Sequence, residues 1–394
     1  MLTNKTKKKI ILITSILQPY RISFYYKLSK VLEDRCDLII YHGTKEKEDG
    51  RPAFIGPVPF REKGFPIKTI KILSFTIVIN LGMFKSVREY NPDLIIMQGI
   101  SGDASLRLIA RWAKKQGRKL IFWTCGWEPG LAKGWQLTLK NKYVSSFFRK
   151  ANYHLTYSSN ATKYVESMGV DNSIIETCYN GIETDDLFKN TTEIIRKSKE
   201  VRMEYNLSDH TTFLFVGGLI LEKKVNLLID SFIELLKKYD KIKLLIIGDG
   251  PLKLMVKEKL KVNDDLKIIF LGRIIDGVDP YFAASDCFVL PGVGGLALNQ
   301  AMFWGKTCIV SKADGTEDDL VIEGITGYRF KENDLESLVS AMDRRINESQ
   351  NKVTMMSENS HQIIINKSNV NNMVNIFSST IDNLLMLNKK DNSK

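Results

Sequence analysis

Two glycine turns in the second half of the chain carry residues suited to binding phosphate. The residues are Gly217, Gly218 and Lys223 in the first turn, and Gly294, Gly295 and Leu296 in the second. A glycine turn lets the backbone approach a ligand, and the helix that follows offers unpaired N–H groups to an anion. A lysine beside such a turn can neutralise a diphosphate. We therefore predict a site for a phosphate-bearing ligand, the alternative being that Lys223 only solvates the start of a helix.

Polar and aromatic residues also follow two strand-like runs in the first half. They are Pro19, Tyr20 and Arg21 after the first run, and Trp127 and Glu128 in the segment WTCGWEP. Arg21 is a candidate contact for a phosphate or for a second substrate, and the alternative is an ion pair with a nearby carboxylate. Glu128 is the nearest polar candidate for hydrogen bonds to hydroxyl groups. These residues predict a second binding region at the strand ends.

The glycine turns imply the strands that position them. The apolar runs before the turns are Phe213 to Val216, Leu244 to Ile247, Ile268 to Leu271 and Cys287 to Leu290. Strands buried on both faces of a parallel sheet have this continuous apolar character. A doubly wound sheet binds its ligand at the carboxyl ends of its strands. The second half is therefore expected to be such a domain.

The first half alternates strand-like and helical segments. The strand-like runs are IILITSIL, DLIIYHG, PDLIIMQG, KLIFWTCG and YHLTYS, with helices expected near residues 22–32 and 104–116. Regular alternation indicates βαβ units and a second Rossmann-like domain. Low hydrophobicity over residues 180–210 places the domain boundary near residue 205. We predict an α/β chain with domains at 1–205 and 206–375, and a helix with a polar tail at 376–394.

Composition narrows the class of protein and its partners. With 394 residues, 44% hydrophobic and 26% charged, the chain can form two ordinary cores. The formal net charge of +12 calls for an anionic partner, but the interleaved arginines and aromatics of nucleic-acid modules are missing from the sequence. Five widely spaced cysteines suggest neither a disulfide framework nor a zinc site, so we expect a cytoplasmic protein.

Three segments bear on membrane association. The lysines of residues 5–9 precede a run too short for a signal peptide, so we interpret that run as the first strand. The apolar stretch 72–84 is shorter than the ~18 residues that a span requires. Residues 133–150 contain five basic, four aromatic and no acidic residues. This segment either lies on an anionic membrane surface or packs as an ordinary helix on the sheet, and both interpretations stay open.

The ordered motifs resemble retaining glycosyltransferases of the GT-B fold, family 4, over nearly the whole chain. Residues 216–330 carry GGLILEKKVNLLIDSF, IIGDGP, FLGR, ASDCFVLPG, GLALNQAMFWGK and EGITGYRF. The first half adds PYR at 19–21 and YNGIETDDLF at 179–188. The resemblance implies two Rossmann-like domains facing across a cleft, with a nucleotide-sugar in the second and an acceptor in the first.

The resemblance also assigns roles to residues. It implies donor binding by Gly217, Gly218, Lys223, Arg273, Gly294, Gly295, Leu296, Asn299, Gln300, Gly315 and Thr316. It implies acceptor binding by Pro19, Tyr20, Arg21 and Trp127, and catalytic roles for Lys223, Arg21 and Glu128. No metal and no cofactor are implied, because cationic side chains and helix dipoles stabilise the leaving diphosphate. The carboxylates of residues 314–320 are therefore expected in a turn and a capped helix, with a metal site as the alternative.

The chain departs from the family pattern at three positions. The family usually has arginine where Gly218 stands, and its pair of glutamates aligns with Gly292 and Gln300. Gln300 or Asn299 can still hydrogen-bond ribose hydroxyls, whereas Gly292 cannot replace a carboxylate facing the donor sugar. Arg273 is a candidate replacement cation or a stacking partner for the base, and a solvated loop arginine is the alternative.

These inferences predict a hexosyltransferase-type enzyme, EC 2.4. It would move a sugar from a nucleotide-sugar, a UDP-sugar in preference to a GDP-sugar, to a glycan or lipid-linked saccharide acceptor with retention of configuration. Cell-surface polysaccharide synthesis on the inner face of the cytoplasmic membrane is the expected setting. The alternatives are an epimerase or phosphorylase of GT-B fold, or a catalytically degenerate subunit that binds nucleotide-sugars.

Overall fold

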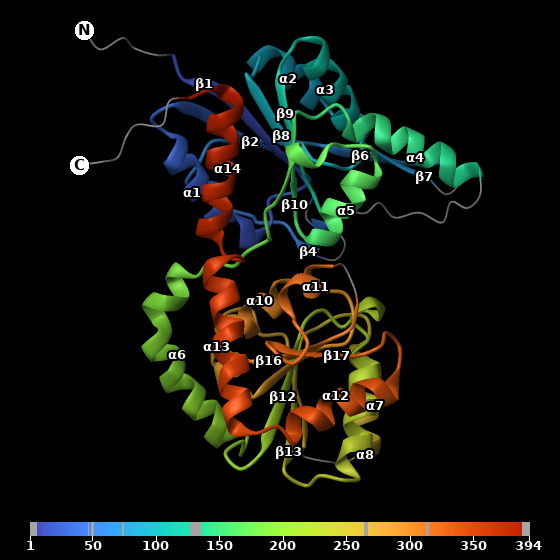
Figure 1. The fold of residues 1–394 in the computed structure, drawn as a ribbon, viewed down its shortest axis with the longest axis vertical. Helices are drawn as coiled ribbons and strands as arrows, with labels where there is room; N and C mark the ends of the chain where they lie inside the picture. Colours follow the sequence, from blue (N-terminus) through green and yellow to red (C-terminus); the bar gives the residue numbers. More distant parts are fainter. Residues whose placement is uncertain are drawn as a thin grey trace. The chain divides into compact units, whose positions relative to one another are not determined.

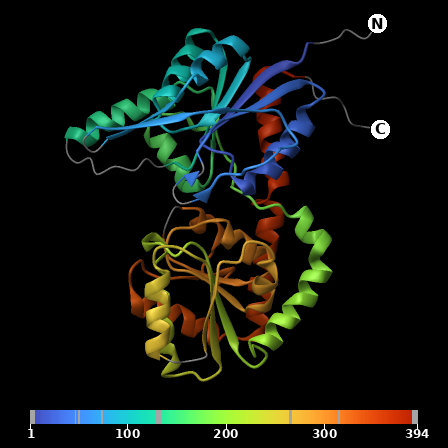
Figure 2. The same ribbon diagram turned by 180° about the vertical axis from the view of Figure 1, so that it is seen from behind.

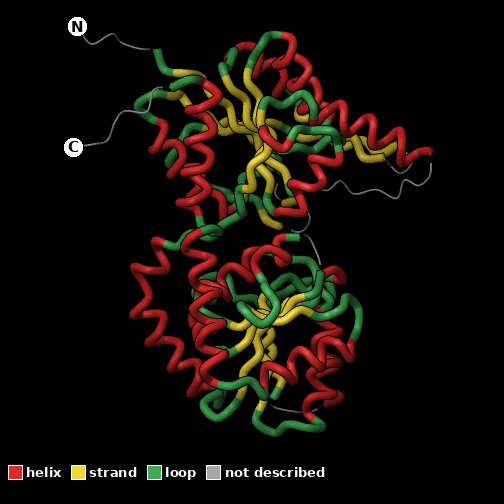
Figure 3. Tube along the Cα trace, viewed as in Figure 1, coloured by secondary structure: helices red, strands yellow, loops and turns green. Residues whose placement is uncertain are grey.

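The computed structural model describes residues 6–45, 47–48, 51–72, 75–126, 135–263, 267–312 and 315–387. By its internal contacts the chain forms two compact units, the first made of Met1–Tyr179 with Val370–Lys394 and the second of Asn180–Asn369. Each unit has strands enclosed by helices (Figure 3). The predicted α/β class is confirmed.

A parallel seven-stranded sheet forms the centre of the first unit, in the order β11-β10-β9-β8-β1-β2-β5. Its strands are β1 (Lys8–Thr14), β2 (Cys36–Gly43), β5 (Glu62–Phe65), β8 (Leu94–Gln98), β9 (Lys119–Thr124), β10 (Tyr153–Thr156) and β11 (Ile175–Thr177). The central strands β1, β8 and β9 are almost wholly buried, which explains their continuous apolar sequences. The five strands expected in this half are confirmed.

Helices cover both faces of this sheet. They are α1 (Ile22–Leu32), α2 (Met83–Tyr90), α3 (Ala104–Lys115), α4 (Trp135–Phe148), α5 (Ser159–Ser167) and α14 (Val370–Leu385). Shorter elements are the 3-10 turns η1 (Pro19–Arg21) and η2 (Asn172–Ile174), the antiparallel pair β6 (Ile67–Ile72) and β7 (Phe75–Asn80), and the pair β3 (Lys47–Glu48) and β4 (Arg51–Pro52). Helices α2 to α5 contribute to one core, and α1 with α14 to the other.

The C-terminal helix α14 belongs to the first unit. It lies beside α1 (Figure 1), and its Phe377 ring packs edge-on against Phe24 at 4.9 Å and Trp123 at 5.0 Å between ring centroids. Asp382 also forms an ion pair with Arg35 at 2.8 Å. Helix α14 thus begins within the segment predicted to end the second domain at 375 and continues into the helix predicted from 376. The whole helix belongs to the first unit, because its apolar face completes the core over α1.

In the second unit a parallel six-stranded sheet has the order β14-β13-β12-β15-β16-β17. Its strands are β12 (Thr211–Val216), β13 (Ile242–Ile247), β14 (Ile268–Gly272), β15 (Cys287–Leu290), β16 (Thr307–Val310) and β17 (Gly327–Arg329). The four strands expected before the glycine turns are confirmed. The chain order reverses between β12 and β15, which are neighbours at the centre of the sheet.

The helices of the second unit lie on both faces of its sheet (Figure 2). They are α6 (Asp185–Glu204), α7 (Val225–Leu236), α8 (Lys253–Asn263), α9 (Asp279–Ala284), α10 (Leu296–Phe303), α11 (Thr316–Leu320), α12 (Leu335–Ile346) and α13 (Gln350–Asn366), with the 3-10 turn η3 (Leu221–Lys223). Helix α6 packs along α9, and Arg202 donates to the carbonyl of Ala284. The unit therefore begins before α6 and not near residue 205, because the low hydrophobicity of this segment reflects a surface helix and not a linker.

The basic aromatic segment forms α4 in its described part. Val144, Phe147 and Phe148 are buried in the first core, and the Phe147 ring lies 4.6 Å from Phe122. Tyr143 is half exposed beneath the Arg107 guanidinium. These aromatics pack as in an ordinary helix on a sheet, while a membrane contact of this helix stays a prediction. In the described part of the chain, no helix combines the length and apolar character needed to span a bilayer.

Candidate functional site

Lys223 lies where the two predicted glycine turns meet. Its Nζ donates to the carbonyl oxygen of Val293 at 2.6 Å and also to that of Gly294. A Cβ built on Gly295 would lie 3.4 Å from the same Nζ, and one on Gly217 would lie 3.8 Å from the lysine Cδ. Residues that are far apart in the sequence therefore converge at one point, as the sequence predicted.

The second of these turns presents the start of α10. In the described structure no side-chain capping hydrogen bond is made at the N-cap residue of this helix, Gly295, which has a φ of 151° and a ψ of 169°. Uncapped N–H groups and the positive end of the helix dipole favour an anion at this point. The helix follows β15, which pairs with β12 where the chain order reverses, and doubly wound sheets bind ligands at such a position. Lys223 and the start of α10 together form the candidate anion site.

Backbone contact fixes the turn that carries Gly217. A Cβ on Gly248 would lie 2.0 Å from the carbonyl oxygen of Gly217, so no side chain fits at this position. The Leu219 N–H donates to the carbonyl of Asp249 at 2.9 Å. The Asp249 carboxylate accepts the Gly250 N–H at 2.9 Å, and this bond together with Lys253 lowers the pKa of Asp249. The GDGP motif thus shapes the glycine turn at Gly217, which follows the neighbouring strand β12.

Gly292 replaces a family glutamate at a position where no side chain fits. A Cβ there would lie 2.0 Å from the carbonyl oxygen of Glu222, which also accepts the Val293 N–H at 2.9 Å. The two turns are in direct main-chain contact at this point. Gly218, where the family usually has arginine, is different: no described heavy atom lies within 4 Å of a Cβ built on it.

The side-chain amides of Gln300 and Asn299 have partners within the protein. Gln300 donates to the Asp279 carboxylate at 2.7 Å, which also accepts the Trp304 indole N–H at 2.8 Å. The ribose contact expected of Gln300 stays a prediction. Sequence reasoning missed Asp279, because no motif marks it.

Asn299 joins the segments where the chain enters and leaves the second unit. Its amide nitrogen donates to the carbonyl of Asn180 at 3.1 Å and to the hydroxyl of Ser368 at 2.7 Å, and the residue is only 2% exposed. This position makes Asn299 part of the structure of the unit. Its predicted contact with the donor is not tested by these bonds.

The acidic segment after β16 forms a turn and a short helix, as expected. Glu317, only 1% exposed, accepts the Gly315 N–H with both carboxylate oxygens at 3.2 Å, and Asp318 pairs with Arg329. Asp314 lies outside the described residues. The donor contacts predicted for Gly315 and Thr316 stay predictions.

Arg273 occupies an exposed turn after the edge strand β14. It lies within electrostatic range of Asp249 on the neighbouring turn. Arg273 thus follows the carboxyl end of its strand, as the glycine turns of Gly217 and Gly294 follow theirs. Its contact with a donor stays a prediction.

In the first unit, Arg21 is buried at the carboxyl end of β1. Its Nη2 donates to the Tyr157 hydroxyl at 2.9 Å and its Nε to Gln18 Oε1 at 3.2 Å. The guanidinium carbon lies 3.9 Å from the centroid of the Trp123 ring. Among the described residues, the hydrogen-bond and stacking partners of Arg21 are therefore neutral, and the structure shows no ion pair of Arg21 with a described carboxylate.

The residues around Arg21 follow the ends of neighbouring strands. Trp123 lies near the end of β9, and Tyr157 directly follows β10. Sequence reasoning missed Gln18, Trp123 and Tyr157, although their positions at strand ends could have indicated the last two. Pro19 is exposed and Tyr20 partly exposed, whereas Trp127 and Glu128 lie outside the described residues.

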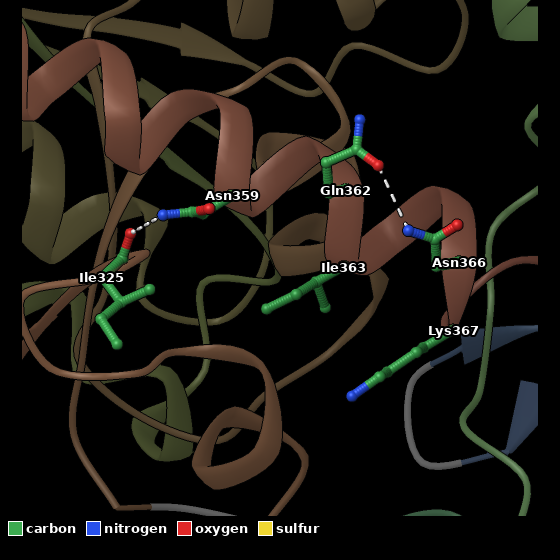
Figure 4. Close-up of a pocket in the computed structure, with 6 residues that line it drawn as sticks. All are labelled: Ile325, Asn359, Gln362, Ile363, Asn366 and Lys367. Carbon is green, nitrogen blue, oxygen red and sulfur yellow. Dashed lines mark hydrogen bonds between the residues drawn. The ribbon is translucent and has the colours of Figure 1, made fainter.

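A surface pocket on α13 is lined by different residues (Figure 4). Its lining consists of Ile325, Asn359, Gln362, Ile363, Asn366 and Lys367. Asn359 donates to the carbonyl of Ile325 at 3.3 Å, and Asn366 donates to Gln362 at 3.2 Å. None of the predicted site residues lines this pocket, so we place the candidate site at the strand ends.

Comparison with known proteins finds a family match within the second unit. Residues 210–348 match the family model described as glycosyl transferases group 1. The lipopolysaccharide 1,6-galactosyltransferase of Escherichia coli (strain K12) is 23% identical over 275 residues, which cover 66% of this chain and 68% of that protein. The lipopolysaccharide 1,2-N-acetylglucosaminetransferase of Salmonella typhimurium is 25% identical over 46% of this chain and 51% of its own length.

Solved structures resemble nearly the whole chain. Anabaena Alr3699/HepE in complex with UDP has a TM-score of 0.71 at 16% identity, over 95% of this chain and 100% of that one. The lipopolysaccharide outer core galactosyltransferase WaaB has a TM-score of 0.66 at 18% identity, over 95% and 99%. The chain therefore has the GT-B fold, and its residues 210–348 match the family model of group 1 glycosyl transferases.

Proposed function

We propose that this chain moves a hexose from a nucleotide-sugar to a glycan or lipid-linked saccharide with retention of configuration. The donor is a UDP-sugar in preference to a GDP-sugar, and the setting is cell-surface polysaccharide synthesis. The observation that carries the proposal is the Lys223 ammonium at the uncapped start of α10. This arrangement suits a diphosphate leaving group.

The site acts by stabilising negative charge as the bond to the diphosphate breaks. Lys223 Nζ is held by two carbonyl groups, and a charged phosphate oxygen is a stronger acceptor than either. Binding of a donor is thus expected to draw the ammonium from these carbonyls onto the phosphate. A positioned hydrogen-bond donor such as this ammonium contributes a factor of about 10² to 10³ in rate. The leaving phosphate can then take the proton of the acceptor hydroxyl on the same face, which requires no separate protein base and no metal.

Relatives support the class of donor and acceptor. Two curated relatives are named as lipopolysaccharide sugar transferases, and structures of Alr3699/HepE contain UDP and UDP-glucose. Identity to these proteins is low, so the sugar and the acceptor remain part of the proposal.

Calorimetric titration of the full chain with UDP-glucose, UDP-galactose, UDP-N-acetylglucosamine and GDP-mannose tests the proposal. A UDP-sugar should bind, and Lys223→Ala should weaken its binding at least tenfold. Lys224→Ala is the matched control, since Lys224 has the same charge but pairs with Glu332 at 2.7 Å. Binding of no nucleotide-sugar, or equal losses in both variants, would contradict the proposal.

One observation favours a second function, that of a nucleotide-sugar-binding subunit without transferase activity. Main chain fills the position where the family has a glutamate facing the donor sugar, at Gly292. Incubation of the bound donor with acceptors, followed by NMR of the products, separates the cases. A new glycosidic bond with the donor's anomeric configuration supports transfer. An intact donor supports the binding subunit, and conversion of the donor without an acceptor supports an epimerase.

A further inference from the structure

Arg21 is a buried cation with no counter-charge among the described residues. It is 4% exposed, and its Nη1 is buried without a hydrogen-bond partner. The other guanidinium nitrogens named above bind a phenol and an amide oxygen, both uncharged groups. Buried arginines are normally paired with carboxylates, since an uncompensated charge in the interior is costly.

The surrounding groups do not remove this cost. Burial raises the pKa of Tyr157, so its phenol stays neutral and cannot balance the guanidinium. Glu176 is the acidic residue on the neighbouring edge strand, and its carboxylate accepts the hydroxyls of Tyr153 at 3.2 Å and Thr380 at 3.4 Å. Stacking on Trp123 offsets only part of the free-energy cost of burying the guanidinium. A cation above an aromatic ring is stabilised less than a cation in an ion pair in the interior.

A second donor in the same cluster also lacks a partner. Trp123 is 1% exposed, and its indole Nε1 makes no hydrogen bond within the described structure. Trp123 and Arg21 are in contact, so two unused N–H donors belong to one cluster at the carboxyl ends of β1 and β9. A buried donor left unpaired is expensive and usually has a functional explanation.

We propose that the first unit contains its own oxyanion subsite, in which the Arg21 guanidinium binds a phosphate or carboxylate group of the acceptor. The identification of the ligand as the acceptor rests on the proposed function, whereas the anion subsite itself does not. An arginine offers planar, paired N–H donors that match both of these oxyanions. The ligand supplies the charge that the described residues leave out, and Tyr20 is the partly exposed side chain next to the guanidinium, with its ring 5.4 Å away.

Such a subsite restricts the acceptor to anionic molecules. A lipid carrier would present a phosphate or diphosphate, whereas an acidic saccharide would present a carboxylate. Titration of the full-length Lys223→Ala chain, in which the candidate phosphate site of the second unit is disabled, with sodium phosphate, sodium pyrophosphate and glucuronate, with glucose as the uncharged comparison, separates these sources. Tighter binding of pyrophosphate than of glucuronate indicates a phosphate-bearing acceptor, and the opposite order an acidic sugar.

Two variants make the test specific. In the Lys223→Ala chain, Arg21→Met should abolish binding of the anion, and it should raise Tm in the anion's absence, since it removes a buried charge that no described residue balances. Arg107→Gln is the matched control: Arg107 is also a buried, aromatic-stacked arginine of this unit, but it donates to the carbonyls of Ser101 and Tyr143. Arg107→Gln should lower Tm and keep anion binding.

The outcomes distinguish failure of the subsite from failure of the proposed function. A lower Tm in Arg21→Met, or unchanged anion binding, overturns the subsite even when nucleotide-sugars bind at Lys223. Anion binding lost with Arg21→Met while nucleotide-sugar affinity is unchanged supports it. Loss of nucleotide-sugar binding in Arg21→Met would make Arg21 a donor contact and overturn its assignment to the acceptor.

Discussion

The two units present a cation at the strand ends of similar parallel sheets, but they hold it in opposite ways. In the second unit, Lys223 is accessible and its ammonium is bound by carbonyls of a neighbouring turn. In the first unit, Arg21 is buried against Trp123 with one nitrogen unpaired. An accessible lysine can exchange backbone carbonyls for phosphate at little cost, whereas a buried arginine is poised for one kind of ligand.

This comparison suggests a division of labour between the units. The second unit surrounds its cation with main chain, because Gly248 and Gly292 both allow neighbouring turns to touch. The first unit surrounds its cation with aromatic side chains. Under the proposed function, main-chain groups would recognise a diphosphate common to many donors, while side chains would select among acceptors.

The largest expected effect is at Lys223. Lys223→Ala should lower kcat about 10²-fold or more at saturating donor, because it removes the cation at the start of α10. Steady-state kinetics with the donor found by calorimetry measures this loss. Turnover of Lys223→Ala within a few-fold of Lys224→Ala would place the essential cation elsewhere.

Restoring the family glutamate should damage the second unit. Gly292→Glu puts a Cβ 2.0 Å from the Glu222 carbonyl oxygen, so the two turns must separate and Lys223 loses its geometry. We expect destabilisation by about 1–3 kcal/mol, as for overpacked sites, and a loss of activity. Urea unfolding and turnover check this, with Gly218→Ala as the control at an open glycine. A gain of activity in Gly292→Glu would show that the turns adapt.

Burial of a titratable group in the first unit predicts a pH dependence. Burial lowers the pKa of His154 to about 4, and its ring stacks on Phe148 with 5.8 Å between centroids. The unfolded state therefore takes up a proton near pH 6.5 before the folded state does. Stability is fully present above pH 6.5 and falls as the pH drops towards 4, by up to about 3 kcal/mol.

Urea unfolding at pH 7 and pH 4.5 measures this dependence. His154→Leu should lose less stability between the two values than the unchanged chain. Equal losses in both proteins would show that His154 is not the group that titrates.

The smallest expected effect is at Gly218. Gly218→Arg has room for a side chain and returns the cation that the family usually carries beside the phosphate turn. Donor affinity should rise several-fold, in line with one added charge-assisted hydrogen bond of about 1 kcal/mol. Calorimetry with the same donor gives the change. Weaker binding by Gly218→Arg would mean that the open space is needed by the ligand.

Much of the fold could be predicted because its signals are local. The helix expected near residues 22–32 is α1, Ile22–Leu32, and the four apolar runs before the glycine turns are β12 to β15. Buried strands and glycine turns leave their pattern in neighbouring residues, so no knowledge of distant contacts is needed. The meeting of Lys223 with the second glycine turn depends in addition on the pairing of β12 with β15, which the local patterns did not show.

The membership of α14 and α6 could not be predicted in this way. Both are amphipathic helices, and an amphipathic pattern predicts that one face is buried without indicating which domain core it packs against. The contacts of Arg21 could not be predicted from neighbouring residues for a similar reason, since Trp123 and Tyr157 lie far from Arg21 in the sequence.

The sequence by itself determined the class of fold, the order of strands along the chain and the positions of the glycine turns beside Lys223. Only the tertiary structure decided that Gly292 is closed to any side chain, that Gly218 is open, and that Arg21 is buried with no counter-charge among the described residues. The physical reason is that local conformation depends on neighbouring residues. Space and charge balance at a site depend on segments that meet only after folding.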